Sequence, residues 1–437
     1  MKRTQRAAVA LIVVAAVSSG CGTLQSSTRP QASSPGANLP QPVPRPVTRT
    51  GAGAQVAWLW TQAQGESSLV GYDPTGRQVG RLVRSADSAG IWRSADGASL
   101  FAAGAATITA YAAADGKRLH TYQRPALPIV GEAFSPDGRY LALLLLDGSR
   151  LQVAAIDLQS GESGPAVTVP HDANAAMPGL SGFPPGWAWA DIVFAPDSLH
   201  LYAISDWGGP AKVSAFSLAV GRLQQTGTAP MPKLSCAGPA MALSVVDTAA
   251  TLAAFCHYDG AVWLINLQTL SSHALRPIQN DPFWLSPVFT PDGKLLYLLE
   301  PQTVQVVDFA RQRVVGPVPL PKPTDDRGPL AALTSFFVTP AEAGYVASTV
   351  PVSPDGLKLF VAQPDGVMVL HVPDLKPLAK LASGVNAGEV WVSGDGRTLY
   401  ATADNGRRLV IMSSDGSGMR SVSLPANANG FVASEHG

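Results

Sequence analysis

The chain has 437 residues, and 14% of them are charged, with equal numbers of basic and acidic side chains and a formal net charge of zero. It has no acidic or basic tail, so its charge gives no reason to expect a nucleic acid or an anionic membrane surface as a partner. The length could hold several domains of about 100–200 residues, but an internal repeat that begins near Asp96 favours one large domain.

Residues 1–21 have the pattern of an export segment, which is kept out of the fold. Basic side chains occupy three of the first six positions, and the apolar stretch 7–17 is too short to span a bilayer, which needs about 20 residues. Small residues then precede Cys21. This arrangement resembles the bacterial lipobox, although Ser18 stands where that motif usually has an aliphatic residue.

The lipobox resemblance implies that Cys21 is lipidated and becomes the mature N-terminus. Two acyl chains or more give stable anchoring, so we expect the protein on the extracytoplasmic side of a bacterial membrane, in the cell envelope, held by its lipid without spanning the bilayer. The alternative is an ordinary cleaved signal peptide with an incidental cysteine.

Residues 22–53 are rich in Ser, Pro, Gly, Gln and Thr and nearly free of large apolar side chains. Such a segment cannot bury a core, and we expect a disordered, partly extended tether. It would hold the folded domain, residues 54–437, away from the membrane by a distance on the order of tens of Å.

A box of the form Ser-Pro-Asp-Gly recurs along the rest of the chain, most clearly at 135–138, 290–293 and 353–356. Proline presets φ for the second position of a type I turn, Asp suits the third, and Gly takes the left-handed φ that closes the turn. Apolar residues stand on both sides, so each box is predicted to join two antiparallel strands. With looser copies, seven boxes are marked by Asp96, Asp137, Asp197, Asp247, Asp292, Asp355 and Asp395.

Two of the looser boxes have a residue with a Cβ in place of the glycine, namely Ser198 and Thr248. A Cβ disfavours φ > 0. We therefore predict that these two corners use a different turn.

Three strand-like runs follow each box, and successive boxes are no closer than ~40 residues, which is the spacing of four-stranded propeller blades. A further set at 56–83 has no box, and the stretch 430–434 has the pattern of its missing strand. The sequence therefore predicts an all-β fold: a single β-propeller of eight four-stranded antiparallel blades, closed by pairing of the N- and C-terminal strands. Seven blades is the alternative, because the weakest sets could be insertions.

The stretch 135–142, Ser-Pro-Asp-Gly-Arg-Tyr-Leu-Ala, resembles the WD40-like repeat of bacterial TolB-type propellers, as does 409–420. A box followed by Leu-Tyr and an apolar residue also resembles the YVTN-type propellers of secreted bacterial proteins. These motifs imply the fold and say almost nothing about activity. TolB-like proteins carry an additional N-terminal α/β domain, where this chain has only the tether.

The longest insertions, 169–191 and 320–351, both connect successive blades, so they belong to the propeller rim opposite the boxes, where loops vary and carry function. Exposed aromatic side chains beside polar groups suit recognition of a protein, peptide or glycan. The alternative is that these aromatics pack under their own loops, whereas five tryptophans within strands should form core between blades: Trp58, Trp60, Trp92, Trp263 and Trp391. The candidate ligand-binding residues on that rim are His171, Trp187, Trp189, Trp207, His257 and Trp284.

Cys236 and Cys256 are the two cysteines after the lipobox. Both should lie at the same end of one hairpin, and an oxidising export compartment favours a disulfide between them. Two separate buried thiols are the alternative.

The remaining sequence carries no signature of a reaction or a cofactor. The seven histidines are scattered without metal-ligand spacing, and no nucleophile elbow, phosphate loop or dinucleotide fingerprint occurs. We therefore expect no catalytic residues, metal or cofactor, and interpret the protein as a monomeric, non-catalytic binding or scaffold module for an unknown protein or cell-wall component. The alternative is a propeller enzyme of lactonase or other hydrolase type, with its site at the channel mouth.

Overall fold

The computed structural model describes residues 52–63, 66–83, 90–94, 96–147, 150–169, 190–205, 212–219, 221–230, 241–246, 251–256, 262–267, 271–275, 286–289, 294–299, 303–309, 311–319, 352–372 and 374–432. Within them the chain forms strands β1 to β31 and one short 3-10 helix, η1 (Ala52–Gln55). No helix among these residues is long and apolar enough to cross a bilayer. The predicted signal segment and almost all of the predicted tether lie outside them.

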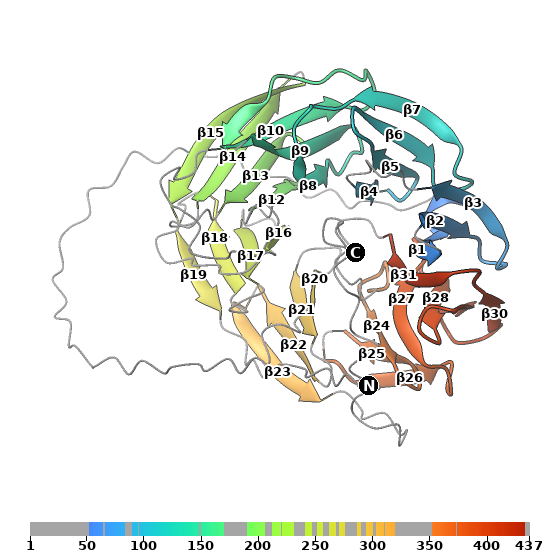
Figure 1. Cartoon of the computed structure of the whole chain (residues 1–437). Coiled ribbons are helices and arrows are strands. Elements are labelled where there is room, and N and C mark those ends of the chain that lie inside the picture. The colour runs from blue at the N-terminus through green and yellow to red at the C-terminus, as the bar shows by residue number, and fades with distance from the viewer. Residues whose placement is uncertain are drawn as a thin grey trace, which may run out of the picture. The chain divides into compact units, whose positions relative to one another are not determined.

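The strands form eight antiparallel sheets arranged as the blades of a propeller (Figure 1). Blade 2 contains β4 (Gly90–Arg93), β5 (Ser99–Ala103), β6 (Thr107–Ala112) and β7 (Arg118–Gln123). Blade 3 contains β8 (Ile129–Phe134), β9 (Tyr140–Asp147), β10 (Arg150–Asp157) and β11 (Val167–Val169). Blade 4 contains β12 (Ala190–Phe194), β13 (His200–Ser205), β14 (Lys212–Ala219) and β15 (Arg222–Pro230). Blade 5 contains β16 (Met241–Val246), β17 (Thr251–Cys256), β18 (Val262–Asn266) and β19 (Ser272–Leu275).

The second half of the chain continues the pattern and then returns to its beginning. Blade 6 contains β20 (Ser286–Phe289), β21 (Leu295–Leu299), β22 (Thr303–Asp308) and β23 (Arg313–Pro319). Blade 7 contains β24 (Lys358–Gln363), β25 (Gly366–His371) and β26 (Pro377–Leu381), and a bridge from Val352 to Leu359 continues its sheet inward. Blade 8 contains β27 (Ala387–Val392), β28 (Thr398–Ala403), β29 (Arg408–Ser413) and β30 (Arg420–Ser423). Blade 1 contains β31 (Asn427–Phe431), β1 (Ala57–Ala63), β2 (Glu66–Tyr72) and β3 (Gln78–Val83).

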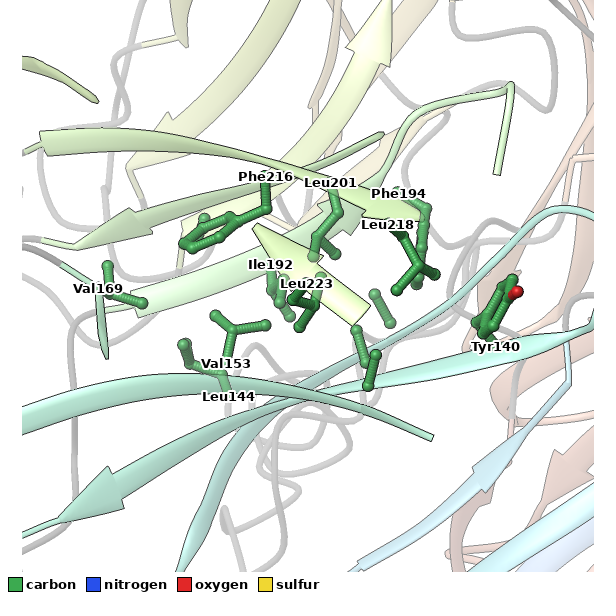
Figure 2. Close-up of a cluster of buried hydrophobic side chains, with 14 of the residues drawn as sticks. Tyr140, Leu144, Val153, Val169, Ile192, Phe194, Leu201, Phe216, Leu218 and Leu223 are labelled. Carbon is green, nitrogen blue, oxygen red and sulfur yellow. The ribbon is translucent and has the colours of Figure 1, made fainter. Parts of the chain in front are cut away.

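Apolar clusters fill the interfaces between neighbouring blades. The cluster between blades 3 and 4 brings Leu144 and Val153 against Ile192 and Phe194 (Figure 2). Each fully buried side chain of this kind contributes roughly 1.5–3 kcal/mol relative to exposure. The described residues form one such cluster for every pair of successive blades, including blades 8 and 1 and blades 1 and 2. An open row of blades would lack one of these interfaces, so the clusters close the ring.

The closing blade combines the two ends of the domain, as predicted. The C-terminal strand β31 pairs antiparallel with β1, so that Leu59 lies opposite Phe431 and Gln62 opposite Asn427. The eight four-stranded blades and their closure confirm the predicted fold class. The predicted core tryptophans are also confirmed, because four are buried and the fifth packs against the cluster of blades 1 and 2: Trp58, Trp92, Trp263, Trp391 and Trp60.

The Asp boxes form the corners between the first and second strands of a blade. In the box at 135–138, the Gly138 N–H donates to the Ser135 carbonyl at 2.8 Å, and Gly138 has a φ of 71°. The Ser135 hydroxyl donates to Asp137 Oδ1 at 2.6 Å, and the same carboxylate oxygen accepts the Arg139 N–H at 3.0 Å. This pattern recurs at the corners of blades 2, 7 and 8.

The prediction of a different turn at Ser198 is wrong. Ser198 adopts a φ of 61° and its N–H donates to the Ala195 carbonyl at 3.0 Å, which is the turn of the other boxes. Its hydroxyl accepts the Asp137 N–H of the neighbouring blade at 3.1 Å, and this bond offsets the cost of a left-handed serine. Thr248 lies outside the described residues.

The strand directions define two rims. The corner rim carries the boxes and the turns between third and fourth strands, such as the one at 73–77; the insertion rim carries the turns between second and third strands and the connections between blades. Helix η1 leads into β1, and β31 ends at Phe431, next to Val432, the last described residue; both lie on the corner rim. The two ends of the described domain therefore lie on the rim opposite to the long connections.

Candidate functional site

The six predicted ligand-binding residues, His171, Trp187, Trp189, Trp207, His257 and Trp284, lie outside the described residues. The strands that flank them are described, and they end or begin at the insertion rim: β11, β12, β13, β17 and β20. The described strand ends thus place the ends of the four connections that carry these residues at one rim. Whether their side chains converge stays a prediction.

The predicted disulfide between Cys236 and Cys256 is likewise not tested by the described residues. Cys256 ends β17, where its backbone pairs with Met241 at the start of β16. Cys236 and Cys21 lie outside the described residues. The disulfide and the lipidation of Cys21 therefore stay predictions.

Three carboxylates lie on inner strands, which surround the propeller axis, and we name them the inner carboxylates: Glu132 on β8, Asp191 on β12 and Glu389 on β27. All three side chains are half-buried. Asp191 is the second residue of β12 and lies close to the insertion rim, directly after the long connection 170–189. From the sequence, Asp191 was expected within the insertion 169–191, and the two glutamates were not singled out.

Glu132 and Asp191 belong to adjacent inner strands that contact each other. Gly131 on β8 lies beside Ile192 on β12, since a Cβ added at the glycine would lie 3.8 Å from Ile192 Cγ2. Burial raises the pKa of Glu132 to about 8, and the charge of Asp191 adds to the shift. At neutral pH, Glu132 therefore favours its protonated form.

Asp191 also makes a local contact that positions its carboxylate. Its Oδ1 accepts the N–H of Ile192 at 2.8 Å. Within the described residues, no group of three His, Cys, Asp or Glu side chains has the arrangement of a metal site. The described part of this region thus offers two carboxyl groups on neighbouring strands, and the pKa of one of them, Glu132, is raised.

Glu389 occupies a different setting, at the interface between blades 8 and 1. The pairing of β27 with β28 is irregular between Ala387 and Val390, and the Glu389 N–H donates to the Thr402 hydroxyl at 2.9 Å. Its carboxylate Oε2 accepts the Phe431 N–H of the closing strand at 3.2 Å. Glu389 is therefore engaged in closing the ring.

On the corner rim, the start of the domain is clamped between blades 2 and 8. The buried Arg93 guanidinium donates to the carbonyls of Gly53 and Val56, the latter at 3.1 Å. The Tyr400 hydroxyl donates to the Gln55 carbonyl at 2.6 Å, and Gln55 Nε2 donates to Asp395 at 3.0 Å. These contacts join blades 2 and 8 to the segment that leads into blade 1, so this part of the corner rim helps to close the ring.

Comparisons with known proteins support the fold and give no evidence about the activity. No protein-family model matches the sequence, and a search of curated proteins found no relative. Among solved structures, the chain is similar to the dihydro-heme d1 dehydrogenase NirN in complex with DHE, with a TM-score of 0.57 and 14% identity over 90% of this chain and 78% of that one. It is also similar to a functionally unknown protein from Desulfotomaculum acetoxidans DSM 771, with a TM-score of 0.50 and 12% identity over 86% of this chain and 98% of that one. The chain is an eight-bladed β-propeller. At these identities the neighbours carry no argument about its activity.

Proposed function

We propose that this propeller is a non-catalytic binding module of the bacterial cell envelope, held by lipid on Cys21 and presenting its insertion rim to a protein or cell-wall component. In this proposal it is a WD40-like propeller lipoprotein of the TolB or YVTN type, with a tether in place of an additional N-terminal domain. It acts on the extracytoplasmic side of the membrane as a monomer.

The observation that carries the proposal is the separation of the two rims. The described domain begins at η1 and ends at Val432 on the corner rim, so an N-terminal tether leaves from that side. The long connections 170–189 and 320–351 start from strands that end at the opposite rim. A lipid anchor would thus leave the insertion rim free, and variable loops on a rigid scaffold are the usual carriers of binding residues.

The charge of the inner strands adds to this argument. Asp191 lies beside the insertion rim with Glu132 on the neighbouring strand, and their coupling gives a site that both donates and accepts hydrogen bonds. A ligand that inserts a hydroxyl, amide or cationic group between the connections would find partners there.

Site-specific photo-crosslinking on intact cells tests the proposal. A photo-crosslinking amino acid replaces exposed Ala105 or Asp147 at the insertion rim, and exposed Ala98 or Leu357 on the corner rim as matched controls. Adducts of one defined partner should form from the insertion-rim positions alone, with the partner identified by mass spectrometry. Equal crosslinking from both rims, or crosslinking from the corner rim alone, would contradict the proposal.

The anchor is tested separately. Cys21→Ser should move the protein from the membrane fraction to the soluble fraction, without changing the crosslinking pattern of purified components. Equal membrane association of variant and wild type would exclude the lipid anchor and leave the rim assignment standing.

A second candidate function, a hydrolase, is favoured by the coupled pair of Glu132 and Asp191. A carboxyl that keeps its proton at neutral pH beside a charged carboxylate can serve as general acid and general base. If the protein hydrolyses lactones or esters, Glu132→Gln and Asp191→Asn should each remove the activity, while the exposed variant Glu162→Gln retains it. Absence of hydrolysis by the full-length protein across such a substrate panel would reject this candidate.

A further inference from the structure

The closing strand β31 is held to blade 8 through a carboxylate. Glu389 Oε2 accepts the Phe431 N–H at 3.2 Å, across the interface between β27 and β31. Gly430 has a φ of 137°, and a Cβ added there would lie 2.9 Å from the same oxygen. The carboxylate therefore fills the space that a side chain at position 430 would need.

Irregular backbone on both sides brings the groups together. The ladder between β27 and β28 shifts between Ala387 and Val390, and the ladder between β1 and β31 shifts between Trp60 and Thr61. Such bulges re-aim a side chain at the cost of local pairing. The Thr402 hydroxyl accepts the Glu389 N–H that is displaced from the ladder, at 2.9 Å, so the position of Glu389 is built into blade 8.

The surroundings of the Glu389 carboxylate disfavour its charged form. Burial raises its pKa to about 7, and the Phe431 N–H opposes this shift only in part. The groups that face Glu389 are the Thr402 hydroxyl from β28 and the backbone of Gly430 and Phe431 from β31. Among the described residues, no charged side chain contributes to the shift.

We propose that Glu389 is a pH-sensitive latch on ring closure, which holds the C-terminal strand against blade 8 when it is protonated and loosens that strand when it is ionised. Separation of β31 exposes the carboxylate to water, where its pKa returns to the ordinary value of 4.5. The open form therefore binds its proton more weakly, and opening becomes easier as the pH rises. Between pH 5 and pH 8, the equilibrium constant for opening of β31 should rise by roughly tens of fold.

Hydrogen exchange of the full-length protein in detergent tests the latch. Exchange rates, corrected for the intrinsic effect of pH, are compared at pH 5, 6.5 and 8 for peptides covering β31 and β1, with β18 and β19 of blade 5 as the internal control. In the wild type, protection at the β1–β31 seam should fall with pH much more steeply than protection in blade 5, which follows the stability of the whole domain. If protection of the wild type at this seam does not change with pH, the proposal is wrong, and no variant is needed to show it.

Matched variants separate the latch from other titrating groups. Glu389→Gln keeps a neutral acceptor, and it should remove the pH dependence at the seam. Glu132→Gln removes the other raised carboxyl, on blade 3, and should leave that dependence in place. If the Gln variant does not fold, Glu389→Met supplies the same comparison. Persistence of the wild-type pH dependence in the Glu389 variants would show that another group controls the strand.

Discussion

The guanidinium of Arg93 lies over the ring of Trp391, with 4.9 Å between Cζ and the ring centroid, although the two residues belong to blades 2 and 8. Blade 1 separates these blades in the ring, and its second strand enters through the residues that Arg93 binds, Gly53 and Val56. One buried side chain thus joins three blades at the point where the ring closes. Arginine suits this role because its planar fork can donate to several carbonyls while its face stacks on an aromatic ring.

Replacing Arg93 should therefore weaken the whole domain. Arg93→Ala removes the hydrogen bonds to both carbonyls and the stacking contact, and should lower the free energy of unfolding by roughly 2–4 kcal/mol. Arg118→Ala on the exposed face of β7 is the matched control, with an effect within about 0.5 kcal/mol. Chemical denaturation of both variants measures the difference, and similar stabilities would mean that the clamp contributes nothing to closure.

Glu132 should make the stability of the protein depend on pH. Burial and Asp191 raise its pKa to about 8 in the folded state, from an ordinary value of 4.5. Because the folded state binds the proton more tightly, this contribution is fully present below pH 4.5 and is lost as the pH rises through 8. At pH 8.5, Glu132→Gln should be more stable than the wild type by roughly 1–3 kcal/mol, with little difference at pH 4.5.

The same experiment tests the coupling. Asp191→Asn removes the neighbouring charge and lowers the folded-state pKa of Glu132, so the fall in stability should end at a lower pH and be smaller. Glu162→Gln, at an exposed corner, is the control and should follow the wild-type curve. Parallel stability curves for wild type and Glu132→Gln across this range would contradict the assigned pKa.

The turn-forming residues of the chain predicted more of this structure than its chemically reactive residues did. Turn residues such as Pro136, Asp137 and Gly138 act over four positions, so the corners, the blades and their number follow from them. Ser198 adopts the left-handed φ that glycine adopts in the other boxes, because a hydrogen bond to Asp137, in the preceding blade, supports it. No pattern within its own box contains that information.

The two inner glutamates, Glu132 and Glu389, were missed for a related reason. Glu132 and Glu389 each stand singly within an otherwise apolar or small-residue strand, and such a position is the signal that could have identified them. Their raised pKa values come from burial by neighbouring blades and, for Glu132, from Asp191 on the next blade. The stacking contact of Arg93 likewise needs Trp391, which is far away in the sequence. These properties arise from ring closure and cannot be predicted from a local motif.

A side chain at position 71 should destabilise the fold, because it would clash with the neighbouring Trp58 ring. A Cβ at position 71 would lie 2.8 Å from atoms of the buried Trp58 ring, and that indole N–H is fixed by a 2.8 Å bond to the Ala113 carbonyl. Gly71→Ala should therefore cost roughly 1–3 kcal/mol through overpacking. Gly227→Ala is the control, since a Cβ there meets nothing within 4 Å. Thermal midpoints of the two variants decide the matter, and equal midpoints would argue against a fixed Trp58 ring.

If the protein is exported as proposed, the thiols of Cys236 and Cys256 should form a disulfide. Alkylation of the intact protein should then add no label to these cysteines before reduction and label both after it, as measured by intact mass. The double variant with serine at both positions should be less stable by roughly 3 kcal/mol, from the chain-entropy estimate for a loop of this length. Labelling of both cysteines before reduction would show separate thiols.

Closure of the ring by β31 is the basis for the rim assignment, the clamp and the latch, and truncation tests it most directly. Thermal unfolding is measured for the chain that ends before Gly430 and for the chain that ends after Val432. The first truncation removes Phe431, which is fully buried between blades 8 and 1, and should lower the midpoint of the whole domain in one cooperative transition. The second retains β31 and should unfold like the full chain; an unchanged midpoint after the first truncation would contradict the closed ring.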